Sequence, residues 1–479
     1  MLGRESATSD STTNVNRERT GICAFNAFNL KRPISDCEPL RRGCLPRNFT
    51  PEQVSIQRPS PYHAPMAAPI NRRNFLFSTS MPAAAVLVGA TPQGHSKPAD
   101  PIGTFEPFIQ RDHLPDPVII DSLDLHGRDG NWFIRVRSKD GAEGWSAGHP
   151  GKMELSQRIF TKVIAPYMSG KDARDLDQLV DGVFLSGSNY KMQGQLFWVP
   201  LAAAEFAILD LLGKVAKCSA ADLLGGQRRQ KIDLYIANNH RSKDPRESLR
   251  RITKSVASIE AKALKIKIGG RMKVVDQVPG RTEKLIPMVA EALGERCTLY
   301  ADANSSYLSV KKAIEVGRIL EANKFAFYEE PVPFDYLDET RRVADALEIP
   351  VAWGEQESSQ WRFNWMVENS GVRIFQPDLF YYGGLIRSLR VARMAAVRGL
   401  DCTPHISGGG LGFLYMGIYA ACCPNPGIHQ EYKGLSRNFP WESTGDKIIV
   451  KGGSMTAPNG HGIGVEIDPA YLAKTDRIK

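Results

Sequence analysis

An alternation of short apolar segments with amphipathic segments, which begins near residue 231, constrains the fold more than any other feature. Eight of the short segments are rich in β-branched and aromatic residues and are bounded by turn residues, as is typical of strands. They are 232–237, 263–268, 298–302, 325–329, 350–354, 372–375, 400–403 and 428–431. Helical patterns fill most of the gaps between them, for example 281–293, 309–321, 336–347 and 385–398. Eight parallel strands joined by helical crossovers predict an α/β fold of the TIM-barrel type.

Three successive predicted strands each end in an acidic residue. Asp302 ends the third strand, Glu329 and Glu330 end the fourth, and Glu355 follows the fifth. The carboxyl ends of barrel strands share one rim, so these side chains are expected to cluster. Clustered carboxylates repel one another unless a cation compensates them. All-oxygen ligands favour Mg²⁺, with Mn²⁺ as the alternative metal.

Two lysines and a histidine–aspartate pair are expected at the same rim. Lys265 and Lys267 share one face of the second strand, because side chains in a strand alternate with a period of two. Their mutual repulsion favours proton loss from one of them, which could then act as a base. Asp378 follows the sixth strand and His405 the seventh, so Asp378 can orient the imidazole and raise its pKa. Each residue alone would be an ordinary surface or structural group; their shared position favours a catalytic site.

The N-terminal half is organised differently. Residues 113–228 contain strand patterns at 117–125 and 131–137, followed by helical patterns that include a long apolar one at 197–216. This order predicts a separate α+β unit. Residues 91–112 are interpreted as a linker.

Residues 1–90 are not expected to join the fold. Residues 1–65 lack hydrophobic periodicity and are interpreted as a disordered or untranslated extension. In residues 66–90, Arg72 and Arg73 precede an apolar run that ends in small residues at Ala90. This pattern is typical of a twin-arginine export signal and predicts a periplasmic protein. The alternative is a basic linker before a short buried helix, in a cytoplasmic protein.

Composition excludes several classes of function. The net charge is +9, but residues 1–100 hold 12 basic and 7 acidic side chains, so the rest is only mildly basic and no nucleic-acid partner is indicated. The eight cysteines form no CxxC pair, which argues against structural zinc or a disulfide framework. No ordinary membrane span is predicted, and the mature form is not expected to bind a membrane.

Seven motifs support a resemblance to a known family. KIK, YADAN, FYEEP, GEQE, QPDLFYYGG, TPHISGGG and HQE follow one another in this order within residues 115–479. The chain thereby resembles the enolase superfamily, specifically its mandelate racemase-like subgroup. The resemblance implies a modified (β/α)7β barrel at 229–440, an α+β capping domain at 113–228, and a C-terminal tail at 441–479 that returns to the cap. It also implies a homo-oligomer.

The resemblance assigns roles to individual residues. Asp302, Glu329 and Glu355 would be the Mg²⁺ ligands. Lys267 would be the base on one face of the substrate, while Lys265 lowers its pKa and touches the substrate carboxylate. His405, paired with Asp378, would be the acid/base on the other face. Glu431 would hydrogen-bond the substrate carboxylate, Asn304 would lie beside the substrate, and Glu330 would support the metal ligands from behind.

The expected chemistry is removal of the proton α to a carboxylate of a small molecule. Dehydration of a hydroxy acid or acid sugar (an aldonate or aldarate) to a 2-keto-3-deoxy acid is the leading hypothesis. The polar residues Asn238, Asn239, His240, Gln356 and Glu357 could bind its hydroxyls. A racemase or epimerase of a 2-hydroxy acid, or a cycloisomerase, would need the same bases, and a noncatalytic binding protein is the third alternative. Specificity is expected from cap loops at 145–152 and 184–198, including Trp198.

Overall fold

The structure is a computed structural model that describes residues 106–434, 443–445 and 448–479. The predicted N-terminal extension, the predicted export signal and residues 91–105 of the predicted linker lie outside the described residues.

The end of the predicted linker belongs to the folded unit. Phe108, Ile109 and Leu114 are buried, and the backbone N–H groups of Phe108 and Ile109 donate to the Asp177 carboxylate at 3.1 Å. The guanidinium of Arg393 lies 3.5 Å from the centre of the Phe108 ring. The linker prediction is therefore wrong for residues 106–112, because their polar side chains outnumber the two apolar ones, Phe108 and Ile109, that pack into the fold.

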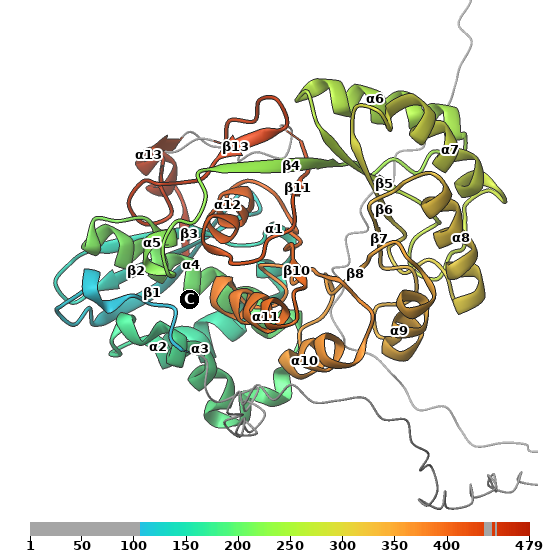
Figure 1. Ribbon diagram of the computed structural model, residues 1–479. Helices are drawn as coiled ribbons and strands as arrows, with labels where there is room; N and C mark the ends of the chain where they lie inside the picture. The colour runs from blue at the N-terminus through green and yellow to red at the C-terminus, as the bar shows by residue number, and fades with distance from the viewer. Residues whose placement is uncertain (1–105, 435–442, 446–447) are drawn as a thin grey trace, which may run out of the picture. The chain divides into compact units, whose positions relative to one another are not determined.

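Eight parallel strands form the barrel sheet, in the order β10-β9-β8-β7-β6-β5-β4-β11. They are β4 (Lys231–Ala237), β5 (Ala263–Lys267), β6 (Thr298–Asp302), β7 (Phe327–Glu329), β8 (Val351–Trp353), β9 (Ile374–Phe375), β10 (Asp401–Cys402) and β11 (Gln430–Tyr432). A helix follows each of the first seven: α6 (Pro245–Ser258), α7 (Arg281–Leu293), α8 (Val310–Ala322), α9 (Leu337–Ala346), α10 (Gln360–Asn369), α11 (Leu385–Val397) and α12 (Gly412–Cys422). The predicted TIM-type (β/α)7β architecture is confirmed (Figure 1).

Local sequence explains these elements. The side chains of Asp244, Ser309 and Ser359 accept backbone N–H groups at the starts of α6, α8 and α10, which satisfies donors that a helix leaves unpaired. Inside the barrel, aromatic and small residues of neighbouring strands pack together. The rings of Tyr300 on β6 and Phe327 on β7 stack with centroids 4.1 Å apart, beside Ala263 and Ala352. The barrel interior is therefore filled below the rim that carries the polar residues.

The cap is an antiparallel sheet covered by helices. Its strands β1 (Ile120–Arg128), β2 (Asn131–Ser138) and β3 (Glu143–Ala147) are followed by α1 (Pro150–Ile159), α2 (Ala165–Met168), α3 (Leu176–Leu185) and α4 (Gln195–Ala216). A π-helical segment at Phe160–Ile164 separates α1 from α2. Helix α4 is long and apolar enough to span a membrane, but 94% of its apolar window is buried inside the protein. It is the core helix of the cap.

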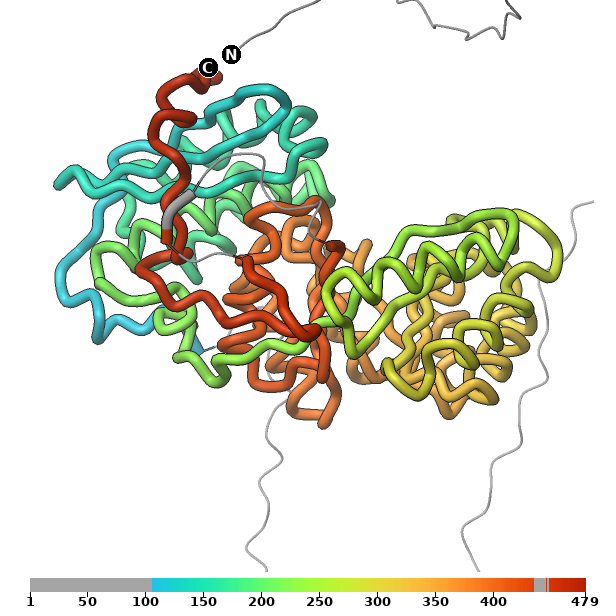
Figure 2. The backbone as a smooth tube through the Cα atoms, turned by 90° about the horizontal axis from the view of Figure 1, so that it is seen from above, coloured from blue at the N-terminus to red at the C-terminus, as the bar shows by residue number. Residues whose placement is uncertain are grey.

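The C-terminal tail contacts both parts. Strand β13 (Ser454–Thr456) pairs with β4 of the barrel, and β15 (Asp476–Ile478) pairs with β1 of the cap. Figure 2 shows this red segment running back to the blue cap strands. One continuous cluster of buried apolar residues includes side chains of cap and barrel, so packing is not interrupted at the predicted boundary near residue 228.

Candidate active site

Three buried carboxylates lie at the barrel rim. Asp302 ends β6, Glu329 ends β7 directly opposite it, and Glu355 follows β8. One oxygen from each carboxylate lies within 4.8 Å of the others. Burial, together with the charge of Asp302, raises the pKa of Glu329 to about 8, and Glu329 Oε1 has no hydrogen-bond partner among the described residues. Two neighbouring lysines, Lys265 and Lys267, compensate the three carboxylates only in part, and one buried oxygen stays unpaired, so the site fits a divalent cation with oxygen ligands.

The two lysines of β5 have different surroundings. Lys265 is fully buried, and its Nζ lies 2.6 Å from Glu329 Oε2 and 3.1 Å from Glu431 Oε1. Burial alone would lower the pKa of Lys265, but these two carboxylates outweigh it and raise the pKa well above its usual range. Lys267 lies opposite Asp302, donates to its Oδ2 and lines the cavity. Lys265 is therefore a fixed cation, and Lys267 is the lysine that substrate can reach.

His405 is held by Asp378. The Nδ1 of His405 lies 2.6 Å from Asp378 Oδ2, and Asp378 also accepts hydrogen bonds from Ser407, Phe380 N and Tyr381 N. The Nε2 of His405 lies 3.3 Å from Glu355 and 3.4 Å from Glu431. Burial opposes the charged imidazole, but Glu355 and Glu431 outweigh it and raise the pKa of His405. Asp378 thus fixes Nδ1 and leaves Nε2 to exchange protons.

Glu431 lies between Lys265 and His405. Burial would raise the pKa of Glu431, but Lys265 and Lys433 hold it well below its usual range. As a carboxylate Glu431 only accepts, so a hydrogen bond from it to a substrate carboxylate requires a proton that arrives with the substrate. Asn304 contacts two of the carboxylates of the triad. Its backbone N–H donates to Asp302 Oδ1 at 2.7 Å, and the side-chain Nδ2 of Asn304 lies 3.5 Å from Glu355 Oε1. Glu330 is buried behind them, 3.5 Å from Ser305 Oγ.

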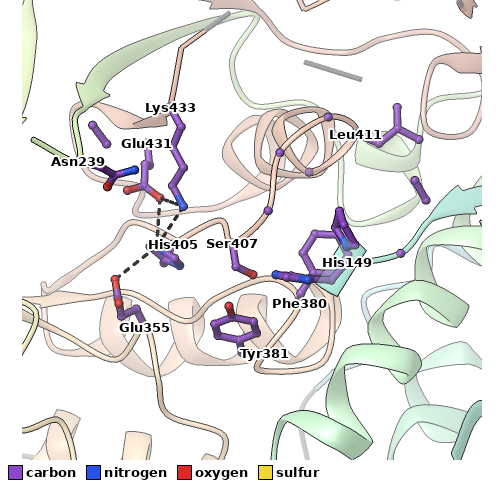
Figure 3. A pocket seen from close by; sticks show the side chains of 18 of the residues that line it. His149, Asn239, Glu355, Phe380, Tyr381, His405, Ser407, Leu411, Glu431 and Lys433 are labelled. Carbon is purple, nitrogen blue, oxygen red and sulfur yellow. Dashed lines mark hydrogen bonds and ion pairs between the residues drawn. The ribbon is translucent and has the colours of Figure 1, made fainter. Parts of the chain in front are cut away.

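A cavity of about 630 Å³ brings the reachable groups together. Lys267, Asn304, Glu355, His405 and Glu431 line it, and Figure 3 shows the last three close to one another. The cap contributes Ala147–Pro150, inside the predicted specificity loop 145–152, together with Asn131 and Trp132.

Some predicted contacts are wrong. Among the described residues that line the cavity, none comes from 184–198, and Trp198 is buried with the Arg387 guanidinium 3.6 Å from its ring, because α4 is a core helix. Of the rim residues expected to bind hydroxyls, Asn239 and Gln356 line the cavity. The remaining three, Asn238, His240 and Glu357, do not. Asn238 Nδ2 donates to the Lys265 carbonyl at 2.7 Å, and Glu357 accepts backbone N–H groups at the start of α10.

Sequence reasoning missed several residues that line the cavity. Lys433 Nζ lies 3.4 Å from His405 Nε2 and 3.5 Å from Glu431 Oε2. Its spacing of two from Glu431 at the end of a strand could have identified it. Arg271, in the loop after β5, and His149, between β3 and α1, also line the cavity. No periodic pattern marks either of them.

Comparisons with known proteins agree with this geometry. The family model described as "Enolase C-terminal domain-like" matches residues 247–471. Arabinonate dehydratase from Saccharolobus solfataricus is 29% identical over 336 residues, which cover 69% of this chain and 87% of that protein. A crystal structure from Roseobacter denitrificans, provisionally described as a racemase, is 32% identical with a TM-score of 0.69 and covers 75% of this chain and 99% of its own.

A mandelate racemase/muconate lactonizing protein from Paracoccus denitrificans, complexed with magnesium, is 26% identical with a TM-score of 0.66. The match covers 76% of this chain and 99% of that one. On these matches and on the site geometry, the chain belongs to the enolase superfamily, in its mandelate racemase-like subgroup.

Proposed function

We propose that the protein dehydrates an acid sugar, an aldonate or aldarate, to a 2-keto-3-deoxy acid in a Mg²⁺-dependent reaction. One observation carries the proposal: two proton-transfer groups reach the cavity from opposite ends of the carboxylate triad. Lys267 contacts Asp302 at one end, and His405 contacts Glu355 at the other. The similarity to an arabinonate dehydratase supports this reaction class.

Asp302, Glu329 and Glu355 would hold the cation, with Mn²⁺ as a substitute. When bound, Mg²⁺ would stabilise the negative charge that develops on the substrate carboxylate. The magnesium complex of the Paracoccus relative supports this metal. The fixed cation Lys265 adds positive charge from beneath the site.

The proton steps follow from the positions of the two bases. A proton α to a carboxylate is weakly acidic, so useful rates need stabilisation of about 10 kcal/mol or more. Lys267 or His405 removes this proton from C2. His405, protonated at Nε2, then gives a proton to the hydroxyl on C3, which leaves as water. The resulting enol takes up a proton at C3 and becomes the 2-keto-3-deoxy acid.

The purified protein with Mg²⁺ and a panel of aldonic and aldaric acids tests the proposal. Dehydration predicts a 2-keto product, which a carbonyl reagent detects. A racemase or epimerase, favoured by the same opposed bases and by the Roseobacter relative, would instead exchange the α-proton for solvent deuterium without releasing a keto acid. Unchanged turnover in a Lys267→Ala variant would show that Lys267 is not a catalytic base, would support a noncatalytic role of the cavity, and would contradict the proposal.

We also propose export through the twin-arginine pattern at 66–90 and assembly as a homo-oligomer. Replacing Arg72 and Arg73 by lysine should retain the protein in the cytoplasm, as fractionation would detect. If residues 1–65 are untranslated, translation starts at Met66, and an N-terminus of the native protein before Met66 would contradict this interpretation. Light scattering of the purified protein measures the oligomeric state.

A further inference from the structure

His149 is a histidine of the cap that faces the cavity of the barrel. It follows β3, begins α1 as its N-cap residue, and is only 9% exposed. Its ring packs against Phe380 and Tyr381 with centroids 5.6 Å away in both cases. A Cβ added to Gly408, in the loop after β10, would lie 3.7 Å from its Cδ2 and 3.8 Å from its Nε2. The ring edge that carries Nε2 is thus turned toward the loop that also holds His405.

The helix cap fixes which nitrogen of His149 carries a proton. The backbone N–H of Lys152 donates to Nδ1 at 3.3 Å, so Nδ1 must present a lone pair and the neutral ring is protonated on Nε2. Burial lowers the pKa of His149 and outweighs Asp378 and a hydrogen bond with the backbone of His149 itself, which raise it, while Lys152 and Lys433 lower it further. Among the described residues, the side-chain hydrogen bond of His149 to another residue is the one at Nδ1, and His149 lines the cavity. His149 therefore presents a neutral N–H donor that cannot become an acceptor without losing the helix cap.

The position of His149 determines what the donor can reach. In Figure 3 it lies beside Ser407 and Phe380, apart from the cluster of His405, Glu431, Lys433 and Glu355. A substrate whose carboxylate end lies at the triad would extend its other end toward the cap. That end of an acid sugar carries hydroxyl oxygens, which accept from a neutral donor.

We infer that His149 is a specificity-determining residue whose Nε2–H donates to a hydroxyl oxygen at the end of the substrate remote from the reacting carboxylate. The inference rests on the proposed function, because it concerns the same cavity. A site built around a buried donor discriminates against ligands that leave the donor unpaired. His149 would thereby select acids long enough to reach the cap.

The test separates the helix cap from the substrate contact. In His149→Asn and His149→Ser the new side chain can still accept the Lys152 N–H, since Asn and Ser are favoured N-cap residues, but it is too short to place a donor in the cavity. Each variant and the wild type are assayed with Mg²⁺ on glycerate, the shortest acid with the required α-proton and β-hydroxyl, and on four-, five- and six-carbon aldonates. Thermal unfolding is measured in parallel.

We expect both variants to keep the wild-type thermal midpoint, while KM rises about 3- to 10-fold for the longer acids and clearly less for glycerate. Wild-type KM for the longer acids in both variants would overturn the inference, and so would an equal rise with glycerate, which would indicate a structural effect. A wild-type protein that turns over neither an acid of this panel nor any aldaric acid would reject the proposed function and the inference together. A wild type that is active beside unaffected variants rejects the inference alone.

Discussion

Burial separates the two lysines of β5 into different electrostatic roles. Lys265 lies between Glu329 and Glu431 with no exposed side-chain surface, whereas Lys267 reaches the cavity. An ion pair at this depth is strongly destabilising when only one partner is removed, because the other charge remains buried. Lys265 is thus as important for the charge balance of the barrel as for chemistry.

A Lys265→Met variant should lower the free energy of unfolding by about 3 kcal/mol in the presence of Mg²⁺, because Glu431 loses its nearest cation. Lys267→Met is the matched control and should cost clearly less, since its partner Asp302 would be neutralised by the bound metal. Denaturant unfolding of both variants measures the difference. Equal losses would contradict the distinct roles of the two lysines.

Asp378 determines what His405 can do. An Asp378→Asn variant should lower kcat by about 10²- to 10³-fold, because a neutral amide neither fixes the Nδ1–H tautomer nor supports the imidazolium. Ser407→Ala removes one hydrogen bond to Asp378 Oδ1, at 2.9 Å, but keeps the carboxylate, and should cost less than tenfold. Steady-state kinetics measure kcat of both variants. Similar losses of kcat in both would show that local packing matters more than the negative charge of Asp378.

Prediction from sequence succeeded where a residue ends a regular strand. Lys267, Asp302 and Glu329 end β5, β6 and β7, so strand periodicity and barrel topology fix their positions at one rim. His149 and Arg271 lie in loops whose paths depend on tertiary packing, so no local pattern revealed them. Trp198 was misplaced for a related reason: an apolar helix gives no sign of which side meets a cavity and which meets other core residues.

At the scale of elements, the metal site joins three neighbouring strands. Asp302, Glu329 and Glu355 come from the ends of β6, β7 and β8, and the neighbouring lysines compensate their mutual repulsion only in part. Ligand binding to the native state alone stabilises it by about 2.7 kcal/mol at a concentration 100 times the Kd. The rim of the barrel is therefore expected to depend on metal for stability as well as for activity.

Mg²⁺ should raise the thermal midpoint of the chelator-treated protein, and a Glu329→Gln variant should lose most of this rise together with its activity. The matched control is Glu357→Gln, a buried acidic residue after β8 that lies outside the triad and should retain the response. Thermal scans over a Mg²⁺ titration measure both. A full Mg²⁺ response in Glu329→Gln would exclude this carboxylate as a ligand.

A second buried carboxylate joins a cap helix to a barrel helix. Glu205 on α4 accepts the backbone N–H of Leu385 and that of Ile386, at 3.2 Å in the latter case, at the start of α11. A Cβ on Gly384, where φ is +109°, would lie 2.4 Å from Glu205 Oε1, so the GG pair of QPDLFYYGG permits this approach. Burial raises the pKa of Glu205 to about 8.

Stability should therefore fall with rising pH. The folded state keeps the Glu205 proton up to about pH 8, whereas the unfolded chain releases it near its usual pKa, so the native state loses free energy between those values. From pH 6 to 8 the loss is on the order of 2 kcal/mol.

A Glu205→Gln variant should lack the part of the decrease in unfolding free energy with pH that Glu205 causes, and denaturant unfolding at several pH values measures this decrease. The pKa of Asp210 is raised only to about 6, so its contribution ends in the lower part of this window and is small beside that of Glu205. An unchanged slope in the variant would show that Glu205 is ionised throughout.

At the scale of the described molecule, the tail ties barrel and cap together. Upstream, β13 pairs with β4 of the barrel; at the end, β15 covers the edge of β1, and Arg477 lies 2.5 Å from the buried Asp124. Asp124 has a second partner, since Arg135 lies 2.7 Å from its other oxygen. The ion pair of Arg477, whose side chain is 61% exposed, should therefore contribute little, and strand pairing should carry the effect of the tail.

Deleting residues 475–479 should lower the thermal midpoint by several degrees and increase proteolysis of the cap, because the edge of β1 is left unpaired. Arg477→Ala, which keeps the strand, should leave both close to wild type. Since β13 lies before the cut, the barrel rim is retained, and kcat measured below the transition should change less than twofold. Limited proteolysis, thermal scans and kinetics on the same preparations compare the three proteins. If Arg477→Ala were as unstable as the deletion, the ion pair with Asp124 would carry the stabilisation instead of the strand pairing. If the deletion had wild-type stability, the pairing of β15 with β1 would not stabilise the cap.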